Sequence, residues 1–125
     1  MKPTIAIIGA STQRNKFGNK AVRAYLRQGY EVYPINPRAS SIDGLPAYRS
    51  IRDVPVPALD RVSIYLPPPV GLEVIDEVTS KPCREVWLNP GAESQALLSR
   101  ARELGLNVVC GCSIVDICVN PHELE

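Results

Sequence analysis

Short apolar segments rich in β-branched residues alternate along this chain with segments that have the apolar spacing of helices. The apolar segments predict strands over Thr4–Ile8, Glu31–Ile35, Arg61–Leu66, Glu85–Leu88 and Asn107–Cys110. The segments between them predict helices over Asn19–Gln28, Val70–Thr79 and Ser94–Leu104. Strands that alternate with helices form parallel sheets with right-handed crossovers. The alternation therefore predicts an α/β fold with five parallel strands and flanking helices.

Glycine and serine mark the expected helix ends. Gly29 and Gly105 follow the first and last predicted helices, where glycine commonly ends a helix. Ser94 is the expected N-cap of the last helix, because its hydroxyl can accept a hydrogen bond from an amide of the first turn. The stretch from Arg38 to Asp60 is interrupted by proline and glycine, and we expect it to hold only a short helix after Ser50.

Length and charge narrow the class of protein. The 125 residues, 45% of them hydrophobic, predict one compact domain over residues 1–125. Lys and Arg number 14 against 13 Asp and Glu, so no basic stripe for nucleic acid is expected. The apolar run Ile5–Ala10 is far too short for a signal peptide or a membrane span. We therefore expect a cytoplasmic protein with no nucleic-acid or membrane partner.

The cysteines do not have the spacing of a metal site. Cys110 and Cys112 flank a single glycine, unlike the two-residue spacing of zinc and thioredoxin-type sites. The only histidine is His122, near the end of the chain. We expect reduced thiols and no bound metal.

The tips of the predicted strands are the candidate ligand site, because ligands of parallel α/β sheets bind at the carboxyl ends of the strands. These tips are Gly9-Ala10-Ser11-Thr12, Asn36-Pro37-Arg38, Leu66-Pro67-Pro68 and Asn89-Pro90-Gly91-Ala92-Glu93. The first tip leads into a helix, whose amides and dipole can hold a pyrophosphate, and Arg14 and Lys16 add positive charge there. The alternative is that Gly9 makes only a strand-to-turn transition.

The tip of the second strand distinguishes between nucleotides. NAD sites usually place an acidic residue there to accept hydrogen bonds from the ribose, but this chain has Asn36, Pro37 and Arg38. A cation at this point favours a ligand with a phosphate on its ribose. NADP carries that phosphate at the 2′ position and coenzyme A at the 3′ position. A solvated surface arginine is the alternative for Arg38.

Several motifs in order resemble a known family. They are IAIIGAS from Ile5, YPINPR from Tyr33, GLPAY from Gly44, LPPP from Leu66, VWLNPGAES from Val86 and GCS from Gly111. Together they resemble the single-domain coenzyme A-binding proteins, which are similar to the N-terminal domain of the succinyl-CoA synthetase α subunit. The resemblance extends from Thr4 to about Val119. It implies a Rossmann-like, doubly wound sheet with coenzyme A lying across the strand tips.

The resemblance also implies a role for individual residues. By position, the phosphate loop would be lined by Ser11, Thr12, Gln13 and Arg14, and the helix would open at Gly18. The adenosine phosphate would lie near Arg38, and the adenine side would be flanked by Leu66, Pro67 and Pro68. The pantetheine arm would be faced by Gly91, Ala92 and Glu93. Cys112 matches a cysteine that recurs in the family, although a buried thiol without function is an equal alternative.

Catalytic residues are not expected. The synthetase needs a further domain with a phosphorylated histidine and a partner subunit, whereas His122 here lies in a charged tail. Ser11, Ser113 and Cys112 have no histidine to activate them. We expect a non-catalytic binding, carrier or sensor module for coenzyme A or an acyl-CoA, as a monomer or homodimer. An acyl-CoA-processing enzyme is the candidate partner. The alternatives are an NADP-binding domain, a ligase-like fragment that needs a partner chain, and an interaction protein without ligand.

Overall fold

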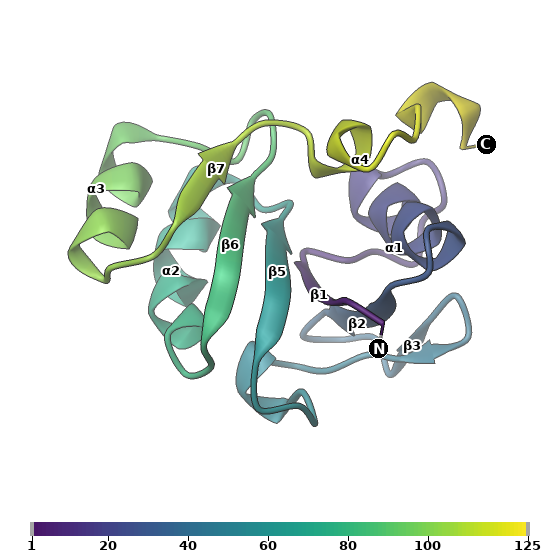
Figure 1. Cartoon of the computed structure of the whole chain (residues 1–125), viewed down its shortest axis with the longest axis horizontal. Helices are drawn as coiled ribbons and strands as arrows, with labels where there is room; N and C mark the ends of the chain where they lie inside the picture. The colour runs from purple at the N-terminus through teal and green to yellow at the C-terminus, as the bar shows by residue number, and fades with distance from the viewer. Residues whose placement is uncertain (1, 125) are drawn as a thin grey trace.

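A twisted parallel sheet forms the middle layer of the molecule (Figure 1). The computed structural model describes residues 2–124. The sheet contains β1 (Thr4–Ile8), β2 (Glu31–Ile35), β5 (Leu59–Ile64), β6 (Cys83–Leu88) and β7 (Val108–Cys110) in the order β2-β1-β5-β6-β7, with every pair parallel. This Rossmann-like arrangement confirms the fold class and all five predicted strands. The boundaries differ by at most two residues.

Helices cover both faces of the sheet. Helix α1 (Phe17–Arg27) packs on one face, where Ile5 and Ile7 of β1 are fully buried. Helices α2 (Pro68–Val78) and α3 (Gln95–Glu103) pack on the other. The connection after β1 runs through α1 on one face of the sheet, whereas the connection after β5 runs through α2 on the other face. The chain therefore leaves the neighbouring strands β1 and β5 in opposite directions. Such a switch point opens a crevice at the carboxyl ends of the strands.

Helix α1 begins two residues earlier than Asn19, the predicted start. The reason is that the Asn19 side chain is buried and is not an N-cap. Its amide donates to the carbonyl oxygen of Ser11 at 2.8 Å and its Oδ1 accepts from Nε of Arg23 at 2.8 Å. Asn19 thus ties the loop after β1 to the helix that follows it.

The other helix ends follow the sequence signals closely. Helix α2 begins at Pro68, two residues before the predicted start at Val70, because proline fits the first turn of a helix, where its missing amide is not needed. Ser94 is the N-cap of α3, and its hydroxyl accepts from the amide of Leu97 at 3.1 Å, as predicted. Gly29 and Gly105 have φ angles of +85° and +75° and end their helices, also as predicted.

The stretch between β2 and β5 contains more structure than predicted. The expected short helix is present as η1 (Ile51–Asp53), capped by Ser50. However, a hairpin of β3 (Ser41–Ile42) and β4 (Leu45–Pro46) precedes it, so the expectation of only a short helix is wrong. Its turn is Asp43-Gly44, where both residues have positive φ, as tight hairpin turns require.

The C-terminal tail, for which the sequence predicted no element, is folded onto the body of the protein. It contains α4 (Ser113–Asp116) and η2 (Pro121–Glu123). Pro121 and Leu124 are buried, and Leu124 belongs to the apolar cluster beneath α1. The hydroxyl of Tyr25 donates to the carbonyl oxygen of Ser113 at 2.9 Å. The tail therefore covers the α1 face near the carboxyl ends of the strands.

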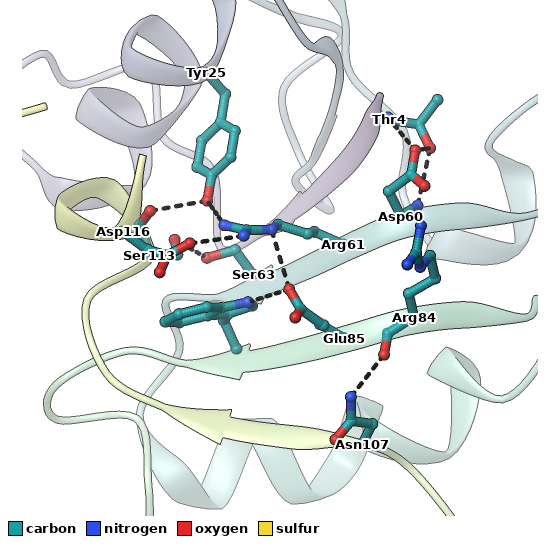
Figure 2. A network of polar contacts seen from close by, with 11 residues as sticks. Thr4, Tyr25, Asp60, Arg61, Ser63, Arg84, Glu85, Asn107, Ser113 and Asp116 are labelled. Atoms are coloured by element: carbon teal, nitrogen blue, oxygen red, sulfur yellow. Dashed lines mark hydrogen bonds and ion pairs between the residues drawn. The ribbon is translucent and has the colours of Figure 1, made fainter. Parts of the chain in front are cut away.

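Arg61 holds the strands to this tail (Figure 2). Its guanidinium lies 2.6 Å from Oδ2 of Asp116 and 3.2 Å from Oε1 of Glu85, and donates to the Tyr25 hydroxyl at 3.1 Å. It also stacks 5.1 Å from the centre of the Trp87 ring. Burial opposes the charge of Arg61, but the hydrogen bonds to Asp116 and Tyr25 outweigh this effect and raise its pKa. Arg61 therefore stays charged and links β5, β6 and α4.

Candidate functional site

The loop after β1 is packed too tightly for any residue but glycine at two positions. Gly9 has a φ of +88°, and a Cβ there would lie 2.6 Å from the carbonyl oxygen of Tyr65. A Cβ at Gly18 would collide with the carbonyl oxygen of Gly9. The two glycines thus allow β1, the start of α1 and the tip of β5 to approach one another. This close packing places the first turn of α1 directly at the strand tips.

A groove of about 430 Å³ lies at this point. It is lined by Gly9, Lys16, Phe17, Gly18, Tyr65, Leu66, Pro67, Pro90, Gly91 and Ala92. The first amides of a helix have no acceptor within the helix and form the positive end of its dipole. Lys16, the N-cap residue of α1, adds a full charge. The groove therefore offers an anion site at α1, with mostly apolar walls beside it.

A second cavity, of about 230 Å³, adjoins the groove. Phe17, Tyr65 and Pro90 line both hollows, and Asn89, Cys112 and Pro121 complete the second one. We call it the terminal cavity, because it lies where the β7–α4 loop and η2 close the site. The groove and the terminal cavity together make a continuous surface from β1 to the chain segment after β7.

A buried polar network fixes the strand tips under the terminal cavity. The amide of Asn89 donates to Oγ of Ser63 at 2.8 Å and to the carbonyl oxygen of Ile64 at 2.9 Å, and its Oδ1 accepts from the amide of Ser113 at 2.9 Å. Oγ of Ser113 lies 2.7 Å from Oγ of Ser63 and 3.1 Å from the Tyr65 hydroxyl. Burial raises the pKa of Tyr65, which therefore stays protonated. The network holds the Tyr65 hydroxyl and Ser113, the residue after Cys112, in fixed positions.

The β2 tip presents Arg38 to solvent. Asn36 shapes this tip: its amide donates to the carbonyl oxygen of Ala10 at 2.9 Å, while Oδ1 accepts from the amides of Arg38 at 2.8 Å and Ala39 at 2.9 Å. The Asn36 side chain is therefore used within the protein to join the β1 and β2 loops. The Arg38 side chain is exposed beside them.

The β3–β4 hairpin contacts the loop after β1 through Asp43. Oδ2 of Asp43 lies 3.8 Å from Arg14 and 4.0 Å from Arg23. Its Oδ1 accepts from the amide of Asn19 at 3.4 Å. The carbonyl oxygen of Arg14 accepts in turn from Arg23 at 2.6 Å. The hairpin that sequence analysis missed thus supports the predicted phosphate loop.

The predicted site residues fall into two groups. Those that line the groove or the terminal cavity are Gly9, Lys16, Gly18, Leu66, Pro67, Pro90, Gly91, Ala92 and Cys112. Those outside both linings are Ala10, Ser11, Thr12, Gln13, Arg14, Asn36, Pro37, Arg38, Pro68 and Glu93. Ala10 is buried, and Oγ of Ser11 accepts from the amide of Gln13 at 3.0 Å, so these two residues shape the loop from within.

Three lining residues were not predicted: Phe17, Tyr65 and Pro121. Asn89, which lines the terminal cavity, was predicted only as part of a strand tip, without a role of its own. Phe17 is the first residue of α1 and is 47% exposed, a large apolar side chain at a helix start. Tyr65 was assigned to a strand that in fact ends at Ile64, so that Tyr65 belongs to the strand tip. Pro121 had no signal, because it reaches the site only through the folded tail.

Among residues 2–124, no group of three metal-ligating side chains comes together. In the same part of the chain, no helix is long and apolar enough to span a membrane. His122 is exposed on η2 and lines neither hollow, although its neighbour Pro121 lines the terminal cavity.

An open α/β sheet with an anion site at the first helix defines a nucleotide-binding class of protein. Within that class, residues 3–118 match the CoA binding domain, and the chain belongs to this family. It is 26% identical to the α subunit of ADP-forming acetate–CoA ligase I of Pyrococcus furiosus over 98% of this chain and 29% of that protein. With the α subunit of ligase II from the same organism, the identity is 41% over 41% of this chain and 11% of that protein. The chain thus spans less than a third of each of these ligase subunits.

Solved structures agree with this assignment. A conserved hypothetical protein from Pyrococcus furiosus superposes with a TM-score of 0.80 and 31% identity, over 93% of this chain and 99% of that one. The dinucleotide-forming acetyl-coenzyme A synthetase 1 of Ca. Korarchaeum cryptofilum gives a TM-score of 0.73 and 32% identity, over 85% of this chain and 25% of that one. The fold therefore occurs both as a chain of this size and as part of larger proteins.

Proposed function

We propose that this protein binds coenzyme A or an acyl-CoA across the carboxyl ends of its strands. Membership of the CoA binding domain family supports coenzyme A as the ligand class. The observation that carries the proposal is the order of chemical groups along the sheet. A cation lies at the β2 tip, an anion site at the start of α1 beside β1, and an apolar surface from β5 to the segment after β7.

Coenzyme A has a matching order of groups. Its ribose phosphate is assigned to Arg38 and its pyrophosphate to Lys16 and the first amides of α1. Leu66 and Pro67 offer apolar contacts to the uncharged parts of the ligand, and the pantetheine arm passes Gly91 toward Cys112. The pantetheine arm needs no charged partner between the β6 tip and the segment after β7, and the residues that line this part of the site are uncharged.

The role we propose is a non-catalytic one, as a carrier, sensor or binding partner for an acyl-CoA-processing enzyme. It is supported by the position of His122, which is exposed and lines neither the groove nor the terminal cavity. A second candidate is a ligase-like chain that acts only together with another protein, and the similarity to ligase α subunits favours it.

Thermal unfolding tests the ligand class. Coenzyme A at 100 times its dissociation constant should raise the melting temperature by roughly 10 °C, since such saturation adds about 2.7 kcal/mol of stability. NADP, NAD and ATP at the same concentration should give clearly smaller shifts, because they lack the pantetheine arm that fills the apolar surface. An equal or larger shift with NADP would assign the site to that nucleotide instead.

Turnover assays test the non-catalytic role. The isolated protein, incubated with acetate, coenzyme A, ATP and Mg²⁺, should form no thioester above a protein-free blank. Thioester formation that is lost in Cys112→Ser or Glu93→Gln would contradict the proposal. Thioester formed only after a second protein is added would establish the ligase-like candidate.

A further inference from the structure

The terminal cavity has an uncharged lining. It is lined by six residues with uncharged side chains, Phe17, Tyr65, Asn89, Pro90, Cys112 and Pro121. The side-chain amide of Asn89 already donates both of its protons within the protein, to Ser63 and Ile64. A carboxylate in this cavity would lose its water and gain no cation among the lining residues, which is costly. The cavity therefore suits an uncharged organic group.

The position of the terminal cavity assigns it to one end of the ligand. In the strand order β2-β1-β5-β6-β7, Arg38 lies at the β2 edge, whereas the cavity lies at the tips of β5 and β6 and the segment after β7. The anion site at Lys16 lies between them, next to the groove that adjoins the cavity. A ligand with its phosphates at Arg38 and Lys16 therefore reaches the terminal cavity with its thiol end.

The buried network can present the Tyr65 hydroxyl as a proton donor to the thiol end of the ligand. Asn89 donates to Oγ of Ser63, and in one order of donors the hydroxyl proton of Ser63 goes to Oγ of Ser113, 2.7 Å away. The proton of Ser113 then goes to the Tyr65 hydroxyl oxygen, 3.1 Å away. This order of donors leaves the Tyr65 proton unused within the network. The Tyr65 proton is thus available to an acceptor outside the network.

The Tyr65 hydroxyl also lies close to the thiol of Cys112. Burial is the main cause of the raised pKa of Tyr65, and the neighbouring Cys112 adds to it. Both residues line the terminal cavity. A hydrogen-bond acceptor that enters the cavity beside Cys112 therefore lies near the protonated hydroxyl of Tyr65. A thioester carbonyl is an acceptor of this kind, while the free thiol of coenzyme A is only a weak one.

We infer that the terminal cavity holds the acyl group of a short-chain, uncharged acyl-CoA, with the thioester carbonyl accepting a hydrogen bond from Tyr65. The inference rests on the proposed function, because it concerns the same site. It makes the protein selective for acyl-CoA over free coenzyme A. It also excludes acyl groups that end in a carboxylate.

Calorimetric titration of the wild-type protein with four ligands tests this selectivity. The ligands are free coenzyme A, acetyl-CoA, n-butyryl-CoA and succinyl-CoA. n-Butyryl-CoA should bind about 15-fold more tightly than acetyl-CoA, because each of its two further methylenes adds roughly fourfold on burial. Succinyl-CoA is the matched control, with the same number of acyl carbons but a terminal carboxylate. It should bind at least about tenfold more weakly than n-butyryl-CoA.

Two variants locate the acyl group. Cys112→Leu should fill the terminal cavity and reduce the ratio of n-butyryl-CoA to coenzyme A affinity to about one. Cys112→Ala, the matched control, enlarges the cavity and should preserve a preference for n-butyryl-CoA. Tyr65→Phe should reduce the acetyl-CoA preference by about two- to tenfold, the value of one hydrogen bond. Circular dichroism confirms that each variant is folded.

The failures of the two proposals give different results. No binding of any of the four ligands would overturn the proposed function. Binding of all four with equal affinity would overturn the acyl inference and leave coenzyme A binding intact. A preference for n-butyryl-CoA that is unchanged in Cys112→Leu would place the acyl group outside the terminal cavity and also overturn the inference.

Discussion

A protein with Gly18 replaced by alanine is expected to melt about 10 °C below the wild type, a loss of roughly 3 kcal/mol. Glycine to alanine within a helix normally stabilises a protein by about 0.5–1 kcal/mol. Here a Cβ would collide with the carbonyl oxygen of Gly9, and its next neighbours are also backbone atoms, of Gly9 and Ala10. Backbone cannot rotate away as a side chain can, so the collision should outweigh the gain in helix propensity.

Gly71→Ala is the matched control, since Gly71 is also a buried glycine of a helix. A Cβ there would meet Leu97 at 3.0 Å, and only through the end of its flexible side chain. Its melting temperature should stay within about 5 °C of the wild type, corresponding to at most roughly 1 kcal/mol. Equal melting temperatures for Gly18→Ala and the wild type would show that the loop after β1 can move away from α1. The test is a pair of thermal melts followed by circular dichroism.

Arg38→Ala is expected to weaken coenzyme A binding by about 10- to 150-fold and to leave 3′-dephospho-coenzyme A nearly unaffected. The physical reason is that a charge-assisted hydrogen bond to the 3′-phosphate is worth roughly 1.5–3 kcal/mol. The exposure of Arg38 places the effect toward the lower end of this range. Higher salt should reduce the wild-type preference for the phosphorylated ligand, because it screens this contact.

The measurement is a calorimetric double cycle with two proteins and two ligands, which yields one coupling energy. Arg102→Ala serves as the control, because Arg102 is an exposed arginine on α3 and lies outside both hollows. An equal loss for both ligands would mean that Arg38 supports the loop and does not contact the phosphate. No loss for either ligand would remove Arg38 from the site.

The sheet could be predicted from the sequence because its strands are buried on both faces and therefore consist almost entirely of apolar residues. The hairpin was missed although Asp43-Gly44 is a strong turn signal, because its strands have only two residues each and show no alternation. The folded tail was missed for a related reason: Pro121 and Leu124 are isolated apolar residues in a polar segment.

The candidate site was predicted less completely than the fold. Glycines and prolines at the strand tips could be identified because they interrupt apolar runs. Asn36 was expected to face the ligand, but its amide is used to join two loops. Phe17 and Tyr65 have the appearance of core residues in the sequence, and only packing shows that they border open space. The residue types that shape a loop from within are the same as those that contact its ligand, so the sequence does not distinguish the two roles.

The position of Asp43 affects how an anionic ligand first meets the protein. The loop after β1 and helix α1 contribute the cations Arg14, Lys16, Lys20, Arg23 and Arg27. The carboxylate of Asp43 lies within ion-pair distance of Arg14 and Arg23. The charge that this region presents to solvent is thus smaller than its number of cations, in a chain whose net charge is only +1. Long-range attraction should therefore accelerate diffusional encounter very little. Recognition of the phosphates then takes place after contact, through short-range hydrogen bonds, and the ligand is selected mainly by how slowly it leaves.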